Sequence, residues 1–186
     1  SLYGVFGTQS CRFFDAEIAN AITGFGRDIL CWAKLRMEHA GYRVLYGDTD
    51  SLFVHAGTDD EAAAAAIAQT LLRNLNRELC GYVRERWSCD SRLELELDAH
   101  YLRLHLPTMR QREGGARKRY AGLIETNGTR SVVFTGMEVV RRDWTPLAKR
   151  VQRELYERLF SDRAVDSYLR ETVRAVLAGA HADLLI

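Results

Sequence analysis

A short turn between two β-strand patterns constrains the fold of this chain more than any other feature of its sequence. Apolar and aromatic residues alternate with Arg43 and Leu45 before the turn, and the run 52–54 after it is wholly apolar, which is typical of a β-hairpin. The turn itself reads Tyr-Gly-Asp-Thr-Asp-Ser and contains Asp48 and Asp50. Because side chains alternate along an extended chain, we expect both carboxylates to project from one face.

Two carboxylates held this close together repel each other unless a cation lies beside them. Oxygen ligands suit Mg²⁺ or Mn²⁺, and Mg²⁺ usually binds one or two carboxylates together with substrate phosphates. Aspartate is also a favoured turn residue because it hydrogen-bonds its own backbone. The pair Asp48 and Asp50 alone therefore leaves both a metal site and a purely structural turn open.

Length and composition indicate a globular chain with a real core. Of its 186 residues, 47% are hydrophobic and 27% charged, which is ordinary for such proteins. No apolar run approaches the roughly 20 residues that a membrane-spanning helix needs. The four cysteines have no metal-binding spacing, which predicts reduced thiols of a cytoplasmic protein.

The net charge of +1 conceals an uneven distribution. Residues 100–158 contain 13 lysines and arginines against 6 acidic residues, while the rest of the chain contains 13 against 19. A basic region beside an acidic one that holds the aspartate turn is the layout expected when one part contacts phosphates and another holds cations.

Periodicity along the chain predicts an α+β fold in which an antiparallel sheet is backed by helices and followed by a small helical segment. Two long helices flank the hairpin, the first capped by Asp15 and the second opened by the acidic run 59–61. Further strands are expected, and two more helices follow, one after Thr145-Pro146 and one from Ser161 or Asp162. The expected strands lie at 93–98, 101–106, 118–125 and 131–135.

Four segments, in the same order, resemble motifs of family B DNA polymerases. The turn 46–51 is similar to the catalytic palm motif of that family, and the opening segment 1–7 to the end of its fingers motif. Residues 117–122 resemble the Lys-Lys-x-Tyr motif, and residues 136–146 resemble the palm-to-thumb junction. The resemblance covers most of the chain and is strongest to bacterial members of the family.

The resemblance implies that residues 1–142 are the C-terminal part of a palm, with the end of the fingers motif at 1–7, and that residues 143–186 start a thumb. It implies template-directed DNA synthesis in replication or repair, by nucleotidyl transfer from a dNTP to a primer 3′-OH with two Mg²⁺ or Mn²⁺ ions. Primer-template DNA and dNTP are the expected partners, with a sliding clamp met through regions outside this chain. The expected location is the bacterial cytoplasm, in association with the nucleoid and not with a membrane.

The same resemblance assigns roles around the turn. Asp50 is expected to be a ligand of both metals and Asp48 a peripheral ligand, while Thr49 and Ser51 fix the turn. Members of the family carry an acidic pair near the metals on a later strand, which makes two residues further metal candidates: Glu94 and Glu96.

Contacts with DNA are implied elsewhere in the chain. Tyr3 and Gly4 match positions that line the minor groove beside the new base pair. A second group matches the motif that contacts primer-template DNA near the primer terminus: Arg117, Lys118 and Tyr120. Weaker candidates for backbone contacts are Arg141, Arg142 and Lys149.

Two other functions remain open at this point. An Asp-x-Asp metal-dependent glycosyltransferase would share the turn, but it predicts parallel strands. A non-catalytic DNA-binding module would explain the basic region and leave the aspartates without a role. The chain contains no Asp-x-x-Ser-Leu-Tyr-Pro motif, which supplies a further metal aspartate in the family, so we expect it alone to be inactive.

Overall fold

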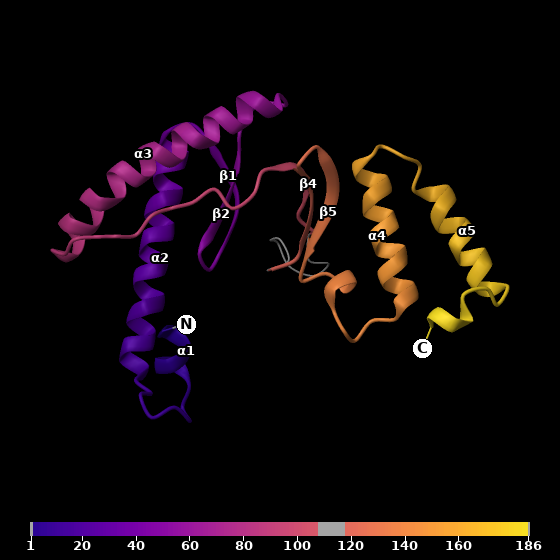
Figure 1. Cartoon of the computed structure of the whole chain (residues 1–186), viewed down its shortest axis with the longest axis horizontal. Coiled ribbons are helices and arrows are strands. Elements are labelled where there is room, and N and C mark those ends of the chain that lie inside the picture. Colours follow the sequence, from indigo (N-terminus) through magenta and orange to yellow (C-terminus); the bar gives the residue numbers. More distant parts are fainter. Residues whose placement is uncertain (1, 108–117, 186) are drawn as a thin grey trace. The chain divides into compact units, whose positions relative to one another are not determined.

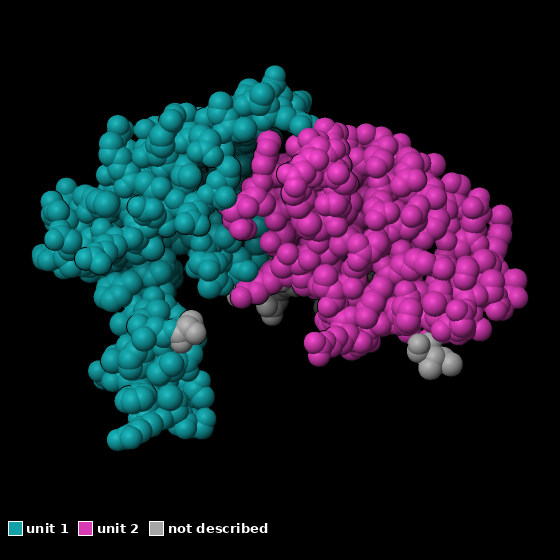
Figure 2. All heavy atoms as spheres, viewed as in Figure 1, with its two compact units in different colours: residues 1–97 teal, residues 98–186 magenta. Residues whose placement is uncertain are grey.

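The computed structural model of the chain describes residues 2–107 and 118–185, and Arg117 lies outside them. It divides into two compact units, residues 1–97 and 98–186, which are treated separately below (Figure 2). Helices combine with two small antiparallel sheets, which confirms the α+β prediction. The palm-to-thumb boundary near residue 143 falls inside the second unit and stays a prediction.

The first unit consists of three helices and the β-hairpin (Figure 1). Asp15 caps the long helix as predicted, because its carboxylate accepts the backbone N–H groups of Glu17 and Ile18 at 2.9 and 3.0 Å. Asp60 caps the next long helix by accepting the N–H of Ala63 at 2.8 Å. The elements are α1 (Leu2–Gly7), α2 (Ala16–His39), β1 (Arg43–Asp48), β2 (Ser51–His55) and α3 (Glu61–Trp87).

Aromatic side chains hold α2 and α3 together where the two helices cross (Figure 1). Trp32 of α2 stacks on Tyr82 of α3 with ring centroids 5.0 Å apart, and Phe25 meets Trp87 edge to face at 5.1 Å. Leu79 of α3 is completely buried beside this contact region. Aromatic pairs of this kind contribute beyond their buried area, so they fix the frame on which the hairpin lies.

The hairpin pairs β1 with β2 in antiparallel register and contains one β-bulge. Tyr46 pairs with Phe53 and Val44 with Val54, which leaves Leu45 as the extra residue. Bulges bend a strand and are frequent next to active sites. The rings of Tyr46 and Phe53, 5.6 Å apart, lie two residue pairs before the turn.

The strand predicted at 93–98 is absent, and that prediction is wrong. The segment has no partner strand among the described residues. Instead the side chain of Asn76 in α3 takes the place of a partner strand. It donates a hydrogen bond to the backbone carbonyl of Leu95 at 2.9 Å and accepts one from the backbone N–H of Leu95 at 2.7 Å. Alternation of leucine and acid predicted the extended backbone but could not supply a neighbouring strand.

The second unit is built on a three-stranded antiparallel sheet in the order β3-β4-β5. Its strands are β3 (Tyr101–His105), β4 (Tyr120–Thr126) and β5 (Thr129–Thr135). Asn127 and Gly128 form the predicted two-residue turn, with φ of 53° and 74°, which is the backbone that Asn-Gly hairpin turns require.

Helix α4 (Pro146–Phe160) covers this sheet and begins at Thr145, whose hydroxyl accepts the N–H of Ala148 at 3.2 Å. The core of the unit lies between them and includes Ala121 of β4 and Tyr156 of α4. A short 3₁₀ helix, η1 (Glu138–Val140), connects β5 to α4. No helix among the residues described is both long and apolar enough to cross a membrane.

The last α-helix, α5 (Asp166–Leu177), begins later than predicted and is followed by the 3₁₀ helix η2 (Ala182–Leu184). Residues 161–163 end α4 instead of opening α5, because Asp162 has a φ of 54° and the N–H of Arg163 returns to the carbonyl of Arg158 at 2.9 Å. That pattern closes a helix C-terminus. The apolar stripe of α5 stays exposed, with Leu177 at 82%.

Candidate functional site

The aspartate turn closes the hairpin with two residues, Thr49 and Asp50, between the paired Asp48 and Ser51. The N–H of Asp50 donates to the carbonyl of Asp48 at 2.5 Å, and the Ser51 hydroxyl donates to the same carbonyl at 3.2 Å. The Thr49 hydroxyl donates to the Asp48 carboxylate at 3.1 Å. Both hydroxyls therefore fix the turn, as predicted.

Thr49 carries the backbone strain of this turn. Its φ is 48°, a value that β-branched residues seldom adopt and that two-residue turns usually assign to glycine. The expectation of extended backbone through residue 50 is therefore wrong, since β1 ends at Asp48 and Asp50 lies in the turn. Strained residues of this kind cluster at functional sites, where surrounding contacts hold them.

The two carboxylates have different surroundings. Asp48 is half-buried and accepts the Thr49 hydroxyl, whereas Asp50 is exposed. The structure gives the Asp50 side chain no hydrogen-bond partner among the residues it describes. Asp50 is thus the carboxylate more open to an outside ligand, and Asp48 is the more constrained of the two.

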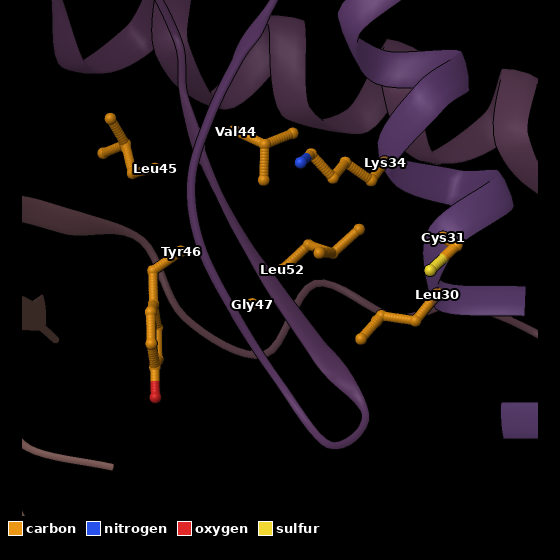
Figure 3. Close-up of a pocket in the computed structure, with 8 residues that line it drawn as sticks. All are labelled: Leu30, Cys31, Lys34, Val44, Leu45, Tyr46, Gly47 and Leu52. Carbon is orange, nitrogen blue, oxygen red and sulfur yellow. The ribbon is translucent and has the colours of Figure 1, made fainter. Parts of the chain in front are cut away.

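The hairpin is supported from one side by α2. Figure 3 shows Val44 and Leu52 of the hairpin facing Lys34 and Leu30 of α2, while Tyr46 points away from that helix. A small pocket opens between these elements, and neither aspartate lines it. The residues around this pocket therefore belong to the contact between α2 and the hairpin, and the exposed turn is the candidate site.

Gly47 lets the two strands close tightly just before the turn. A Cβ atom at Gly47 would lie 3.0 Å from Cδ2 of Leu52, the residue opposite it in the register. The Leu52 side chain therefore occupies the space that a side chain on Gly47 would need. This packing holds Asp48 at the end of a rigid strand.

The donor set of the turn fits part of a magnesium site. Two carboxylates, one of them open, match the one or two carboxylates that Mg²⁺ usually takes before substrate phosphates and water complete its shell. No three acidic, histidine or cysteine side chains in the described ranges gather closely enough to hold a metal by themselves. Glu94 and Glu96 are exposed on the irregular segment after α3 and remain candidates only.

Tyr3 and Gly4 lie on α1, which packs against α2. The Tyr3 side chain is 49% exposed, and its ring covers Gly7, where a Cβ atom would be 3.5 Å from the ring. Gly4 is exposed on the same helix, and its carbonyl accepts the hydroxyl of Thr8 at 2.7 Å. Their predicted role at the minor groove stays a prediction.

In the second unit, Lys118 lies two residues before the start of β4 and is exposed. Its φ is 56°, so its backbone is held in a left-handed conformation. Gly136, at the end of β5, has a φ of 60°, and a Cβ atom there would lie 1.9 Å from the Lys118 carbonyl oxygen. Only glycine permits this approach, so Gly136 sets the position of Lys118.

Tyr120 opens β4 and contacts Tyr101 of β3 edge to face, with ring centroids 6.1 Å apart. The Tyr101 ring lies over Gly122, where a Cβ atom would be 2.2 Å from Cδ1 of the ring. The pKa of Tyr101 is raised to about 12, mainly by burial and further by its hydrogen bond and charge interaction with Tyr120. Tyr101 is therefore the ring that braces Tyr120.

Sequence reasoning missed a partly buried polar network next to Lys118. Glu138 in η1 accepts hydrogen bonds from the Arg119 guanidinium and, at 2.6 Å, from Gln152 of α4. Burial raises the pKa of Glu138, but the Gln152 bond, its own backbone N–H and Arg119 outweigh burial and hold that pKa below its ordinary value. Glu138 lies in the segment 136–146 that resembles the palm-to-thumb junction, but nothing in the sequence indicates that it pairs with Arg119, 19 positions earlier.

Several arginines of residues 100–158 are engaged in ion pairs within the second unit. Arg141 pairs with Asp143 at 2.6 Å and Arg130 with Glu125 at 2.9 Å, and Arg103 pairs with Asp162 at 2.6 Å. Arg141 is therefore a weaker candidate for DNA contact than the sequence indicated. Arg142 is exposed and lies before α4, and Lys149 is half-buried in the first turn of that helix. Among the described residues, neither of them forms an ion pair.

Comparison with known proteins gives a consistent result. The family model described as DNA polymerase family B matches residues 1–186. DNA polymerase II of Escherichia coli (strain K12) is 43% identical over 96% of this chain, which spans 23% of that protein. A DNA polymerase of Archaeoglobus fulgidus is 33% identical over 88% of the chain and 17% of its own length.

A solved structure agrees with these relatives. The family B DNA polymerase from the hyperthermophilic archaeon Pyrobaculum calidifontis superposes with a TM-score of 0.57 at 30% identity, covering 95% of this chain and 19% of that one. The chain thus spans about a quarter or less of the length of the polymerases that it matches.

Proposed function

Because this chain belongs to DNA polymerase family B, we propose that it is the part of a DNA-directed DNA polymerase that carries metal-binding aspartates and a DNA-contacting strand. The reaction proposed is transfer of a nucleotide from a dNTP to a primer 3′-OH on template DNA. Similarity to E. coli DNA polymerase II supports a place on the chromosomal DNA of a bacterial cell. Residues 1–142 are proposed as palm and residues 143–186 as the start of the thumb.

The observation that carries this proposal is the turn. It presents an exposed Asp50 beside a hydrogen-bonded Asp48 at the end of a hairpin braced by α2. Asp50 would be the main ligand of Mg²⁺ or Mn²⁺ and Asp48 the peripheral one. Bound there, divalent ions would lower the charge on the attacking and leaving oxygens of the phosphoryl group. The rest of the ligand set, including a further aspartate, must come from outside this chain.

The DNA contacts are proposed at the start of β4. Lys118 would contact phosphate, and Tyr120, braced by Tyr101, would lie against the sugar or base edge near the primer terminus. Tyr3 and Gly4 are proposed to face the minor groove of the new pair. Arg117 belongs to the same proposed contact by its place in the motif, and a sliding clamp stays a proposed partner of other regions.

The two alternative functions explain fewer of the observed features. A nucleotide-sugar fold requires parallel strands, and every strand pair among the described residues is antiparallel, so the glycosyltransferase alternative is wrong. A DNA-binding module without catalysis would have no use for a strained turn with an open carboxylate.

The test is primer extension by the full-length polymerase that carries this chain, with Mg²⁺ or Mn²⁺ titrated against wild type and Asp50→Ala. Extension that depends on the cation and is lost in Asp50→Ala, while DNA binding persists, supports catalysis at the turn. Unchanged extension by Asp50→Ala would remove the turn from the active site.

A further inference from the structure

Glu138 lies where three elements of the second unit meet. Its side chain is 14% exposed and accepts hydrogen bonds from Arg119, just before β4, and from Gln152 of α4. The side-chain amide oxygen (Oε1) of Gln152 in turn accepts the N–H of Val139 in η1 at 2.9 Å. One carboxylate therefore ties the start of β4, the 3₁₀ helix and α4 together.

The anchored residue, Arg119, stands between Lys118 and Tyr120, the two proposed DNA contacts. An anchor on the middle residue restrains the backbone on both sides of it. The close approach of Gly136 to the Lys118 carbonyl restrains the same segment at a second point, two residues before Glu138. The pairing also offsets the charge of Arg119, which makes that residue part of the support and not a phosphate contact.

We propose that Glu138 is a positioning residue for DNA: by anchoring Arg119 it holds Lys118 and Tyr120 in the arrangement that contacts primer-template DNA, and through Gln152 it couples that arrangement to α4. The inference rests on the DNA contact proposed above. It adds a residue that makes no contact with DNA and acts only through its neighbours.

Charge and positioning predict opposite results for Glu138→Gln. The substitution keeps the size of the side chain and removes a negative charge, so charge alone would strengthen binding to a polyanion. If Glu138 positions the segment, the weakened bond to Arg119 loosens Lys118 and Tyr120, and binding becomes weaker. We expect affinity to fall on the order of tenfold, the size of one coupled interaction.

The experiment measures fluorescence anisotropy of labelled primer-template DNA with the full-length polymerase across a salt series, together with thermal unfolding of each variant. The matched control is Glu125→Gln, which loses the charge of the exposed Glu125–Arg130 pair on the same β4–β5 hairpin. We expect Glu125→Gln to bind as tightly as wild type or more tightly. Binding of Glu138→Gln equal to or tighter than wild type would overturn the proposal.

A charge-neutral variant covers the case in which Glu138→Gln does not fold. Gln152→Met keeps the side-chain size and removes the bonds to Glu138 and Val139 without changing any charge. Weaker DNA binding by folded Gln152→Met supports the proposal, and unchanged binding refutes the coupling to α4. In a double-mutant cycle, Arg119→Gln combined with Glu138→Gln should bind no more weakly than Arg119→Gln alone.

Lys118→Ala separates this inference from the function on which it rests. If Lys118→Ala changes neither affinity nor salt dependence, the proposed DNA contact is wrong and the inference fails with it. If Lys118→Ala weakens binding while Glu138→Gln does not, only the role of Glu138 is refuted.

Discussion

The carbonyl oxygen of Lys118 lies 1.9 Å from the position that a Cβ atom of Gly136 would occupy. Gly136 also has a φ of 60°, so both its backbone conformation and its surroundings exclude a side chain. This contact joins the residue that follows β5 to the backbone two residues before β4. It fixes the backbone of Lys118, the lysine of the proposed DNA-contacting motif.

Gly136→Ala should therefore destabilise the second unit, by roughly 2–4 kcal/mol, because positive φ strain and a backbone clash act together. Gly128→Ala is the matched control, since Gly128 has a φ of 74° but nothing within 4 Å of a Cβ atom. It should lose only the conformational part, roughly 1–2 kcal/mol. Chemical denaturation measures the free energy of unfolding of both variants. Equal losses would mean that the close approach to Lys118 does not contribute to the cost of Gly136→Ala.

Asp50→Ala should lower the rate of synthesis by the full-length polymerase a hundredfold or more, because loss of a metal ligand worth a few kcal/mol has that effect. Asp48→Ala should be milder, since Asp48 is half-buried and already accepts the Thr49 hydroxyl. Asp59→Ala, at an exposed aspartate before α3, serves as the control. Steady-state primer extension measures all three, and a larger defect in Asp48→Ala would reverse the two roles.

Lys118→Ala should weaken binding to primer-template DNA of every sequence alike and flatten the slope of log affinity against log salt by about one unit. A phosphate contact releases a counterion and carries no base information. Anisotropy titrations over a salt series with two unrelated DNA sequences measure both effects. A slope identical to wild type would indicate that Lys118 is only a solvated charge.

Tyr101→Phe should lose a constant part of the stability with the hydrogen bond to Tyr120, and it should also reduce the further loss of stability at alkaline pH. The pKa of Tyr101 is raised from 10.0 to about 12, so between these values the folded state holds a proton that the unfolded chain has lost. Stability therefore falls as pH rises from 10 to 12, and the phenylalanine variant should lose less. Denaturation at a series of alkaline pH values tests this, and parallel curves for both proteins would contradict it.

This chain alone should extend no primer with Mg²⁺ and all four dNTPs. The turn supplies two aspartates, while the Asp-x-x-Ser-Leu-Tyr-Pro motif and all but the end of the fingers motif do not occur in these 186 residues, so we expect the charge-stabilising geometry to be incomplete. Extension by the purified chain, with Asp50→Ala as its own control, would refute this expectation.

Local sequence signals were sufficient for most of the elements. Asp15, Thr145 and the Asn127-Gly128 pair act over a few residues, through caps and turn conformations that need no distant partner. For that reason the two long helices, both hairpins and the start of α4 could be predicted. The position of the aspartate turn could be predicted for the same reason, since its residues are contiguous, and its role as a metal site stays a prediction.

Contacts between distant residues were decided only by the tertiary structure. Leu93 to Asp98 has the alternation of a strand, but a strand needs a neighbour, and the chain offers Asn76 of α3 in its place. Arg119 and Glu138, or Lys118 and Gly136, carry no pairing signal in the sequence, because a salt bridge or a close backbone approach depends on where β4 and β5 bring them. The sequence by itself determined where the two long helices, the start of α4, the hairpin turns and the two aspartates occur, because those signals are local. The tertiary structure decided what holds the proposed DNA-contacting residues in place, because those contacts join distant residues.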